Sequence, residues 1–178
     1  VDSAGSAAIG WPETGLNICD YYEQYNRQYL PECLLTDAGL FIAWLDFRTD
    51  YVNSAYGQLI SSQGIKLWNP EGVALTNPAS EDSYIRLMLN NNQITVFTTE
   101  SLTGVTSTIR MQKYTYAGVP LFEDSGIAVN TNPLPSHYTE TCPTLFDNGG
   151  ILVSWNNYTV DEHNNYSDND VFYRFINS

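Results

Sequence analysis

Lysine is nearly absent from this chain: Lys66 and Lys113 are the only two, and the seven Lys and Arg residues stand against 20 Asp and Glu. The formal net charge is −13 at pH 7 and the sequence pI is about 4.2. Such an acidic surface repels phosphate backbones and anionic lipid head groups. The composition therefore predicts no nucleic-acid partner and favours solubility. It leaves Ca²⁺ as a candidate cofactor, because carboxylates bind this ion.

Long apolar runs are also missing. No run of about 18 apolar residues occurs, so the sequence predicts no membrane insertion. No charged and apolar signal-peptide regions open the chain, and it starts with Val1, so we expect a processed protein or an excised piece. The three cysteines fit no zinc spacing. Cys19 and Cys33 are either bridged or free buried thiols, and Cys142 is left over in both cases.

Helical periodicity is equally scarce, with residues 20–30 as the one candidate segment. The chain instead has 13 Tyr, 43% hydrophobic residues and short β-branched or aromatic runs bounded by Gly, Asn and Asp. With 178 residues it is long enough for one domain with a sizeable core. The sequence predicts an all-β fold.

A turn signature recurs three times. Its landmarks are two glycines with an aromatic residue between them: Gly5, Trp11 and Gly15; Gly64, Trp68 and Gly72; Gly118, Phe122 and Gly126. The last two copies lie 54 residues apart, and Trp11 and Gly15 precede their counterparts by 57. Three apolar runs end at an aromatic residue: Trp44, Phe97 and Trp155. The first two runs each precede a copy of the turn, and the third follows the last copy. We predict that these three aromatic residues occupy equivalent buried positions.

One repeat unit has room for about four strands, expected near 31–36, 40–46, 54–61 and within 65–76. Four-stranded units repeated at this period are typical of β-propeller blades. We expect 1–178 to be one propeller segment, divided into the end of a blade plus a linker (1–29), two blades (30–76 and 77–130), and a blade lacking its last strand (131–178). We expect flanking sequence, a second polypeptide or another copy of the chain to complete the propeller.

The blade expected over 30–76 resembles the W-x-D-x-R … I-Y-x-Q … G-x-x-x-W repeats of secreted propeller proteins that are common in Bacteroidota. The match is carried by Trp44, Asp46, Arg48, Tyr56, Gln58, Gly64 and Trp68. The resemblance implies a secreted or cell-surface module of a large exported protein, often one carried by type IX secretion.

Two sets of residues are candidates for ligand binding. Asp46 and Arg48 lie two residues apart, so they either hold a ligand at the blade mouth or form a structural ion pair. Tyr21, Tyr25 and Tyr29 would form one stripe of a short helix. Such a stripe suits either sugar stacking or packing against a neighbouring blade.

A third set is acidic. Asp161, Glu162, Asp168 and Asp170 either collect one Ca²⁺ or form a solvated loop, and their order is not that of an EF-hand. No catalytic pattern stands out, and the Gly64–Trp68 spacing does not match the repeat of sialidases. The sequence therefore predicts a non-enzymatic scaffold or recognition module with a glycan or protein ligand. The alternatives are a fragment of a sialidase-like glycoside hydrolase and a structural spacer in an adhesin.

Overall fold

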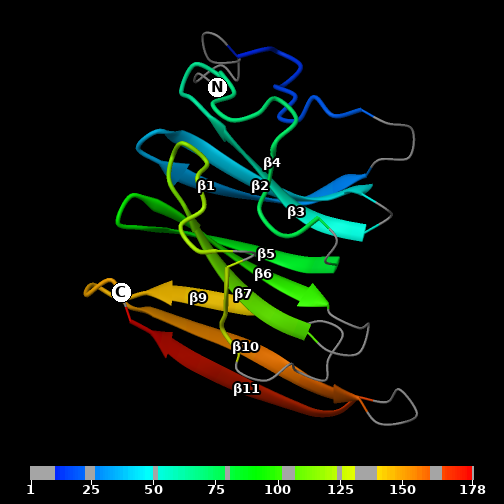
Figure 1. The fold of residues 1–178 in the computed structure, drawn as a ribbon, viewed down its shortest axis with the longest axis vertical. Helices are drawn as coiled ribbons and strands as arrows, with labels where there is room; N and C mark the ends of the chain where they lie inside the picture. Colours follow the sequence, from blue (N-terminus) through cyan, green and yellow to red (C-terminus); the bar gives the residue numbers. More distant parts are fainter. Residues whose placement is uncertain are drawn as a thin grey trace.

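Three antiparallel sheets make up the described part of the chain (Figure 1). The computed structural model describes residues 11–22, 27–49, 52–78, 81–101, 107–123, 126–130, 140–160 and 166–177. The first sheet contains β1 (Gln28–Thr36), β2 (Gly39–Thr49), β3 (Val52–Ile60) and β4 (Val73–Ala74). The second contains β5 (Glu81–Asn90), β6 (Gln93–Ser101), β7 (Ser107–Tyr114) and β8 (Ile127–Ala128). The third contains β9 (Thr141–Leu145), β10 (Ile151–Val160) and β11 (Tyr166–Ile176).

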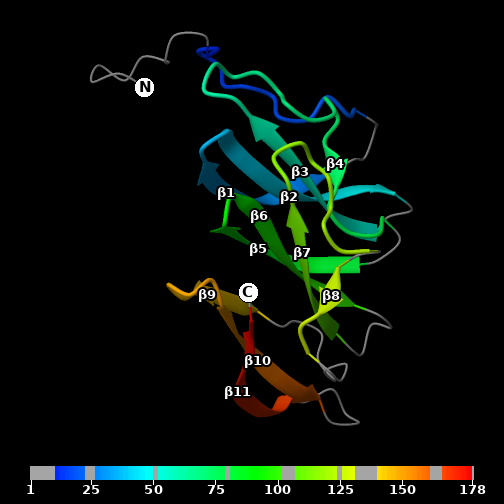
Figure 2. The ribbon, with the colours of Figure 1, turned by 60° about the vertical axis from the view of Figure 1, so that its left-hand side comes forward.

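Within each sheet, strands that are adjacent in sequence are also adjacent in space. The sheets follow one another along the long axis of the molecule, with residues 11–22 at one end and the third sheet at the other (Figures 1 and 2). The first strands β1, β5 and β9 contact one another in succession. This confirms the predicted all-β fold built from propeller-type blades.

Two apolar clusters fill the spaces between successive sheets. The cluster between the first and second sheets includes Phe41, Leu59, Trp68, Val96 and Tyr114. The cluster between the second and third includes Phe97, Met111, Val153 and Trp155. Because each sheet is only one layer, it buries its apolar faces against its neighbours, and stability comes from these interfaces.

The repeated turns take the same shape in each unit. The amide of Gly72 donates to the carbonyl of Asn69 at 2.8 Å, and that of Gly126 to Glu123 at 3.2 Å. Gly72 has φ +85°, and a Cβ at this position would lie 2.7 Å from the Trp44 ring. Both the backbone conformation and the close approach of Trp44 therefore require glycine here.

The hydrogen bonds of Gln58 explain why a glutamine recurs in the repeat. The Gln58 side chain is fully buried and accepts hydrogen bonds from the amides of Trp68 at 2.9 Å and Leu59 at 3.1 Å. Its Nε2 donates to the carbonyl of Asn69 at 2.6 Å. Gln112 does the same for Phe122 in the second sheet. The glutamine thus binds the segment that leads into the short fourth strand.

We expect Gln58→Met to lower the free energy of unfolding by about 2 kcal/mol or more, because it leaves buried backbone groups without partners. Chemical denaturation measures this change. Gln63→Met is the control, because Gln63 is exposed. Equal losses in the two variants would contradict the role given to Gln58.

The predicted equivalence of three aromatic residues needs correction. Trp44, Phe97 and Trp155 are all buried in the second strands of their sheets, but Phe97 is not equivalent to the two tryptophans. Trp44 pairs with Tyr56 and Trp155 with Phe172, whereas the corresponding pair in the second sheet is Thr98 with Arg110. Phe97 is one position earlier and so lies on the opposite face, against the third sheet.

The helix expected over residues 20–30 is wrong. Tyr21 and Tyr22 are not helical, and Gln28–Thr36 is strand β1. In the described part of the chain, no helix has the length and apolar character to cross a membrane. Cys19, Cys33 and Cys142 are free, so the free-thiol alternative holds, although Cys33 is exposed rather than buried.

Candidate recognition cleft

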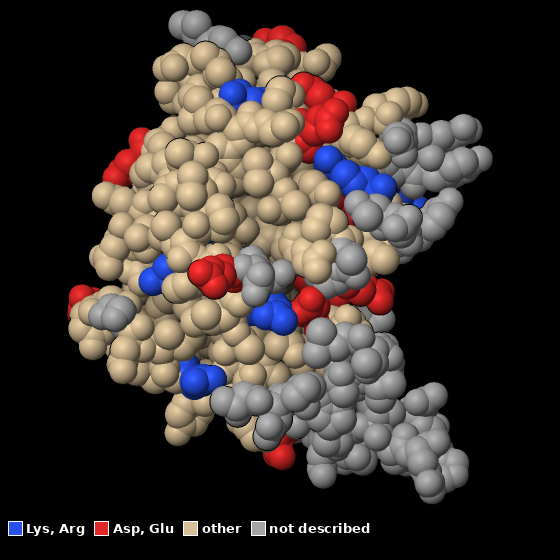
Figure 3. Space-filling model, viewed as in Figure 1, with Lys and Arg blue, Asp and Glu red and all other residues tan. Residues whose placement is uncertain are grey.

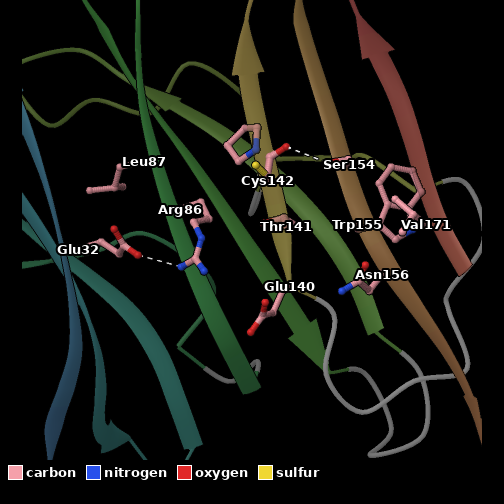
Figure 4. Close-up of a pocket in the computed structure, with 11 residues that line it drawn as sticks. Glu32, Arg86, Leu87, Glu140, Thr141, Cys142, Ser154, Trp155, Asn156 and Val171 are labelled. Carbon is pink, nitrogen blue, oxygen red and sulfur yellow. Dashed lines mark hydrogen bonds and ion pairs between the residues drawn. The ribbon is translucent and has the colours of Figure 1, made fainter. Parts of the chain in front are cut away.

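A cleft of about 400 Å³ lies where the first strands of the three sheets come together (Figure 4). Ligand pockets commonly have volumes in this range. Its residues are Glu32, Arg86, Leu87, Glu140, Thr141, Cys142, Pro143, Ser154, Trp155, Asn156 and Val171. All three sheets therefore contribute to one cleft.

The cleft is built on one repeated position of the fold. Glu32 pairs with Ala43, Arg86 with Phe97 and Cys142 with Ser154, which are corresponding positions of the three second strands. Consecutive sheets thus direct Glu32, Arg86 and Cys142 into the same space. Propeller-type stacking brings these side chains together although they are far apart in sequence.

An ion pair crosses the cleft between two sheets. Arg86 Nη1 donates to Glu32 Oε1 at 2.8 Å and to the carbonyl of Ile85 at 2.9 Å. About a third of each side chain of the pair is exposed, so water screens its attraction. In the view of Figure 4, Arg86 lies between Glu32 and Glu140. The cleft therefore presents carboxylate acceptors and a guanidinium donor side by side.

Two buried polar atoms beside the cleft lack partners. The Nε1 of Trp155 and the Oγ1 of Thr141 are enclosed, and neither has a hydrogen bond to a residue that the structure describes. In the first sheet the corresponding Trp44 donates from Nε1 to Asp46 Oδ2 at 2.9 Å. An enclosed polar group without a partner costs roughly 1–3 kcal/mol, so this wall of the cleft is less stable than its counterpart.

We expect Trp155→Phe and Trp44→Phe to differ in their effects on stability, since only Trp44 loses a hydrogen bond. Trp44→Phe also leaves buried Asp46 with one donor fewer. Its loss in unfolding free energy should exceed that of Trp155→Phe by about 1–3 kcal/mol. Thermal or chemical unfolding of the two variants measures the difference, and equal losses would contradict it.

The structure places the predicted pair Asp46 and Arg48 away from this cleft. Arg48 Nη2 binds Asp46 Oδ2 at 2.5 Å, the Cys19 sulfur at 3.2 Å and the Glu71 carbonyl at 3.0 Å. Its guanidinium lies 4.3 Å from the ring centre of Tyr21 and 4.0 Å from that of Tyr56. Burial lowers the pKa of Arg48, but Asp46 outweighs it and the pKa is raised. These contacts give both side chains a structural role, although Arg48 Nε is enclosed without a partner among the described residues. Their ligand role stays a prediction.

The predicted tyrosine stripe is not one surface. Tyr21 packs against the first sheet next to Arg48, and Tyr29 lies in β1. Tyr29 lines a separate cleft with Arg27, Gln28, Phe47 and Asn53. Tyr25 lies outside the described residues. Sugar stacking by this set remains a prediction.

The predicted Ca²⁺ ligands are only partly described. Asp168 and Asp170 lie in β11, opposite Thr159 and Asn157 of β10, while Asp161 and Glu162 lie outside the described residues. Among the side chains that the structure describes, no three acidic, His or Cys residues gather as a metal site. Ca²⁺ binding remains a prediction.

The face in Figure 3 shows its described acidic and basic side chains in small separate groups. In the described part of the chain, several charged side chains form ion pairs, such as Arg110 with Glu100. Thus the described charges form no continuous field of one sign on this face, and the local mixture of charges in the cleft is what a ligand would meet.

Comparison with known proteins names no family. No protein-family model matches the chain, and no curated protein shows significant similarity. Two crystal structures of a GH43_1 enzyme from Xanthomonas citri are similar, one of them complexed with xylotriose. The complex has 9% identity, a TM-score of 0.45, and coverage of 81% of this chain and 45% of that chain. The other has 9% identity, a TM-score of 0.42, and coverage of 81% and 46%. This chain spans less than half the length of each, and the likeness carries no argument about function.

Proposed function

We propose that the chain is a non-enzymatic recognition module that binds a hydroxyl-rich ligand, such as a glycan, in the cleft between the first strands. The observation that carries the proposal is the mixed lining: Glu32 and Glu140 accept hydrogen bonds, while Arg86 and Asn156 donate them. A hydroxyl group both donates and accepts, so a saccharide matches this mixture. Leu87 and Val171 supply the apolar surface that sugar rings also contact.

An anionic ligand fits this cleft less well. Two carboxylates and one guanidinium leave a local excess of negative charge, and the whole chain is acidic. Binding of a neutral ligand avoids that repulsion. A secreted or cell-surface location, which the repeat resemblance implies, places the module where such ligands occur and is part of the same proposal.

A glycan array probed with the 178-residue chain tests the proposal. We expect binding to a limited set of neutral glycans and a loss of about tenfold or more in Glu140→Gln, which removes the charge of an acceptor. Glu123→Gln is the matched control, because it makes the same chemical change at an exposed site outside the cleft. No binding, or equal binding by both variants, would contradict the proposal.

One observation favours a second candidate. Glu32 and Glu140 place two carboxyl groups in one cleft. Most glycoside hydrolases catalyse hydrolysis with such a pair of carboxyl groups. The sialidase-like alternative therefore requires a direct assay with a panel of aryl glycosides. Turnover that Glu140→Gln abolishes and Glu123→Gln retains would replace the recognition module with a hydrolase. Neither binding nor turnover would favour the structural spacer.

A further inference from the structure

The outer face of the third sheet exposes a row of large side chains. Ile151, Val153 and Trp155 point toward the second sheet, so the alternate positions of β10 and their partners on β11 lie on the opposite face. On β11 these are Val171, Tyr173 and Phe175, which are 70%, 75% and 44% exposed. The corresponding residues of β3 are Ala55, Gly57 and Leu59, which are buried against the second sheet.

Residues 11–21 resemble the segment that leads into β4, but they have no sheet of their own. The Gly15 amide donates to the Pro12 carbonyl at 3.0 Å, as Gly72 does to Asn69. Trp11 Nε1 donates to the Ser62 carbonyl at 3.2 Å, while Trp68 Nε1 donates to the Tyr116 carbonyl at 2.9 Å. Ser62 and Tyr116 are themselves corresponding turn residues, 54 positions apart.

The apolar contacts of residues 11–21 also match those of the segment that leads into β4. Trp11, Leu16 and Ile18 pack against the face of the first sheet formed by Ile42, Trp44 and Ile60. Trp68 and Leu75 pack in the same way against the second sheet. Residues 11–22 therefore contact the first sheet as the last segment of a preceding blade would. Within the described ranges, however, they form no strand and pair with none.

We propose that two copies of the chain associate head to tail, with residues 11–18 of one copy added to β11 of the other as a fourth strand. The pairing of β4 with β3 gives the register: Val73 lies opposite Gly57 and Ala74 opposite Tyr56. The matching turn glycines place Leu16 and Asn17 at the positions of Val73 and Ala74. The stacked ring pairs Trp44–Tyr56 and Trp155–Phe172 correspond to each other. Phe172 therefore takes the position of Tyr56, and Tyr173 takes the position of Gly57.

Leu16 of one copy thus lies opposite Tyr173 of the other, and Asn17 opposite Phe172. The second copy's first sheet then covers the outer face of the third sheet, as the third covers the second. Strand addition at an open edge pairs its free amides and carbonyls, and burial of the exposed face adds apolar contact. Two copies supply six sheets, within the four to eight blades of closed propellers.

This contact also completes the candidate cleft. Ser154, Asn156 and Val171 of the cleft belong to the outer face of the third sheet, the side on which the second copy lies. Within one chain, β1 lies beside β5 and β5 beside β9. When the second copy continues this order, its β1 lies beside β9 and closes that side. The association does not depend on the ligand, so its test is independent of the proposed function.

Light scattering after size-exclusion chromatography gives the first test. We expect the parent chain to have twice its mass of 20.0 kDa, and Tyr173→Lys to have the mass of one chain. Tyr173 is exposed in the single chain, so the variant should keep its fold, which circular dichroism checks. Val119→Lys is the matched control, since Val119 is exposed in a turn of the second sheet, and it should remain a dimer.

Disulfide trapping tests the register. With the exposed Cys33 and Cys142 changed to Ser, oxidation should cross-link chains that carry Leu16→Cys and Tyr173→Cys. Chains that carry Leu16→Cys and Val171→Cys, two residues out of register, should cross-link far less. A parent mass of one chain, which would mean that other sequence covers β11, overturns the proposal. A two-chain mass for Tyr173→Lys, or equal cross-linking of both pairs, also overturns it.

Discussion

Replacing Trp44 with alanine is expected to lower the free energy of unfolding by about 3–5 kcal/mol. Trp44 is 2% exposed and contacts Tyr56, with ring centres 6.5 Å apart, and the turn glycine Gly72. Alanine leaves a cavity between the first sheet and residues 11–21, because the backbones on both sides are fixed by hydrogen bonds. It also removes the donor that Trp44 supplies to buried Asp46.

Chemical denaturation of the parent and the variant measures this loss. Tyr22→Ala is the control: Tyr22 is an aromatic residue of the same region but is 92% exposed, so its removal should change stability little. A loss below about 1 kcal/mol in Trp44→Ala would contradict the packing role of the tryptophan.

The repeat was predictable because its landmarks are local. Glycine is favoured where φ is positive, as at Gly64, Gly72, Gly118 and Gly126, and a large aromatic residue between two such turns fills an interface. Short runs of β-branched and aromatic residues between the turns then fix the strands. The sheets and their order follow from this pattern without any knowledge of long-range contacts.

The mistake about Phe97 has a specific cause. The turns of the two later units lie 54 residues apart, but Trp44 and Phe97 lie 53 apart. In a strand, a difference of one residue moves a side chain to the other face of the sheet. Comparing residues at the turn spacing identifies Thr98 instead, so the information was present in the sequence. Aromatic character at the end of an apolar run is therefore a weaker guide than register.

The cleft could not be predicted from local patterns, because its residues come from three sheets. One signal did exist: Glu32 and Arg86 are separated by the same 54 residues as the turns. This spacing places them at one position of consecutive first strands. The Nε1 of Trp155 had a signal as well: Trp44 donates to Asp46, two residues further on, whereas the residue two positions after Trp155 is Asn157.

The buried carboxyl group of Asp82 links the first two sheets. Its Oδ2 accepts hydrogen bonds from the amide of Ala55 at 3.0 Å and from the hydroxyl of Thr76, while Oδ1 has no partner among the described residues. Burial raises the pKa of Asp82 to about 7, and the hydrogen bonds from Thr76 and Ala55 only partly oppose this shift. Glu100 raises the pKa further and Arg110 lowers it.

This pKa makes stability depend on pH in a defined direction. The ordinary pKa of 3.8 applies in the unfolded chain, so between pH 3.8 and about 7 the folded state binds more protons than the unfolded state. Stability therefore falls as pH rises through this range and levels off above it. A shift from 3.8 to about 7 corresponds to about 4 kcal/mol.

We therefore expect Asp82→Asn, which keeps the shape of the side chain without its charge, to be about 4 kcal/mol more stable than the parent near pH 8. Near pH 4 the two should be almost equal, because the parent carboxyl is then protonated in the folded chain. Chemical denaturation across this range measures the difference in unfolding free energy between Asp82→Asn and the parent. The pH effects of all other carboxylates are the same in both proteins, so they cancel in this difference. Glu81→Gln changes the exposed neighbouring residue, and its unfolding free energy should vary with pH in parallel with that of the parent. A constant difference between Asp82→Asn and the parent at all pH values would show that folding does not raise the pKa of Asp82.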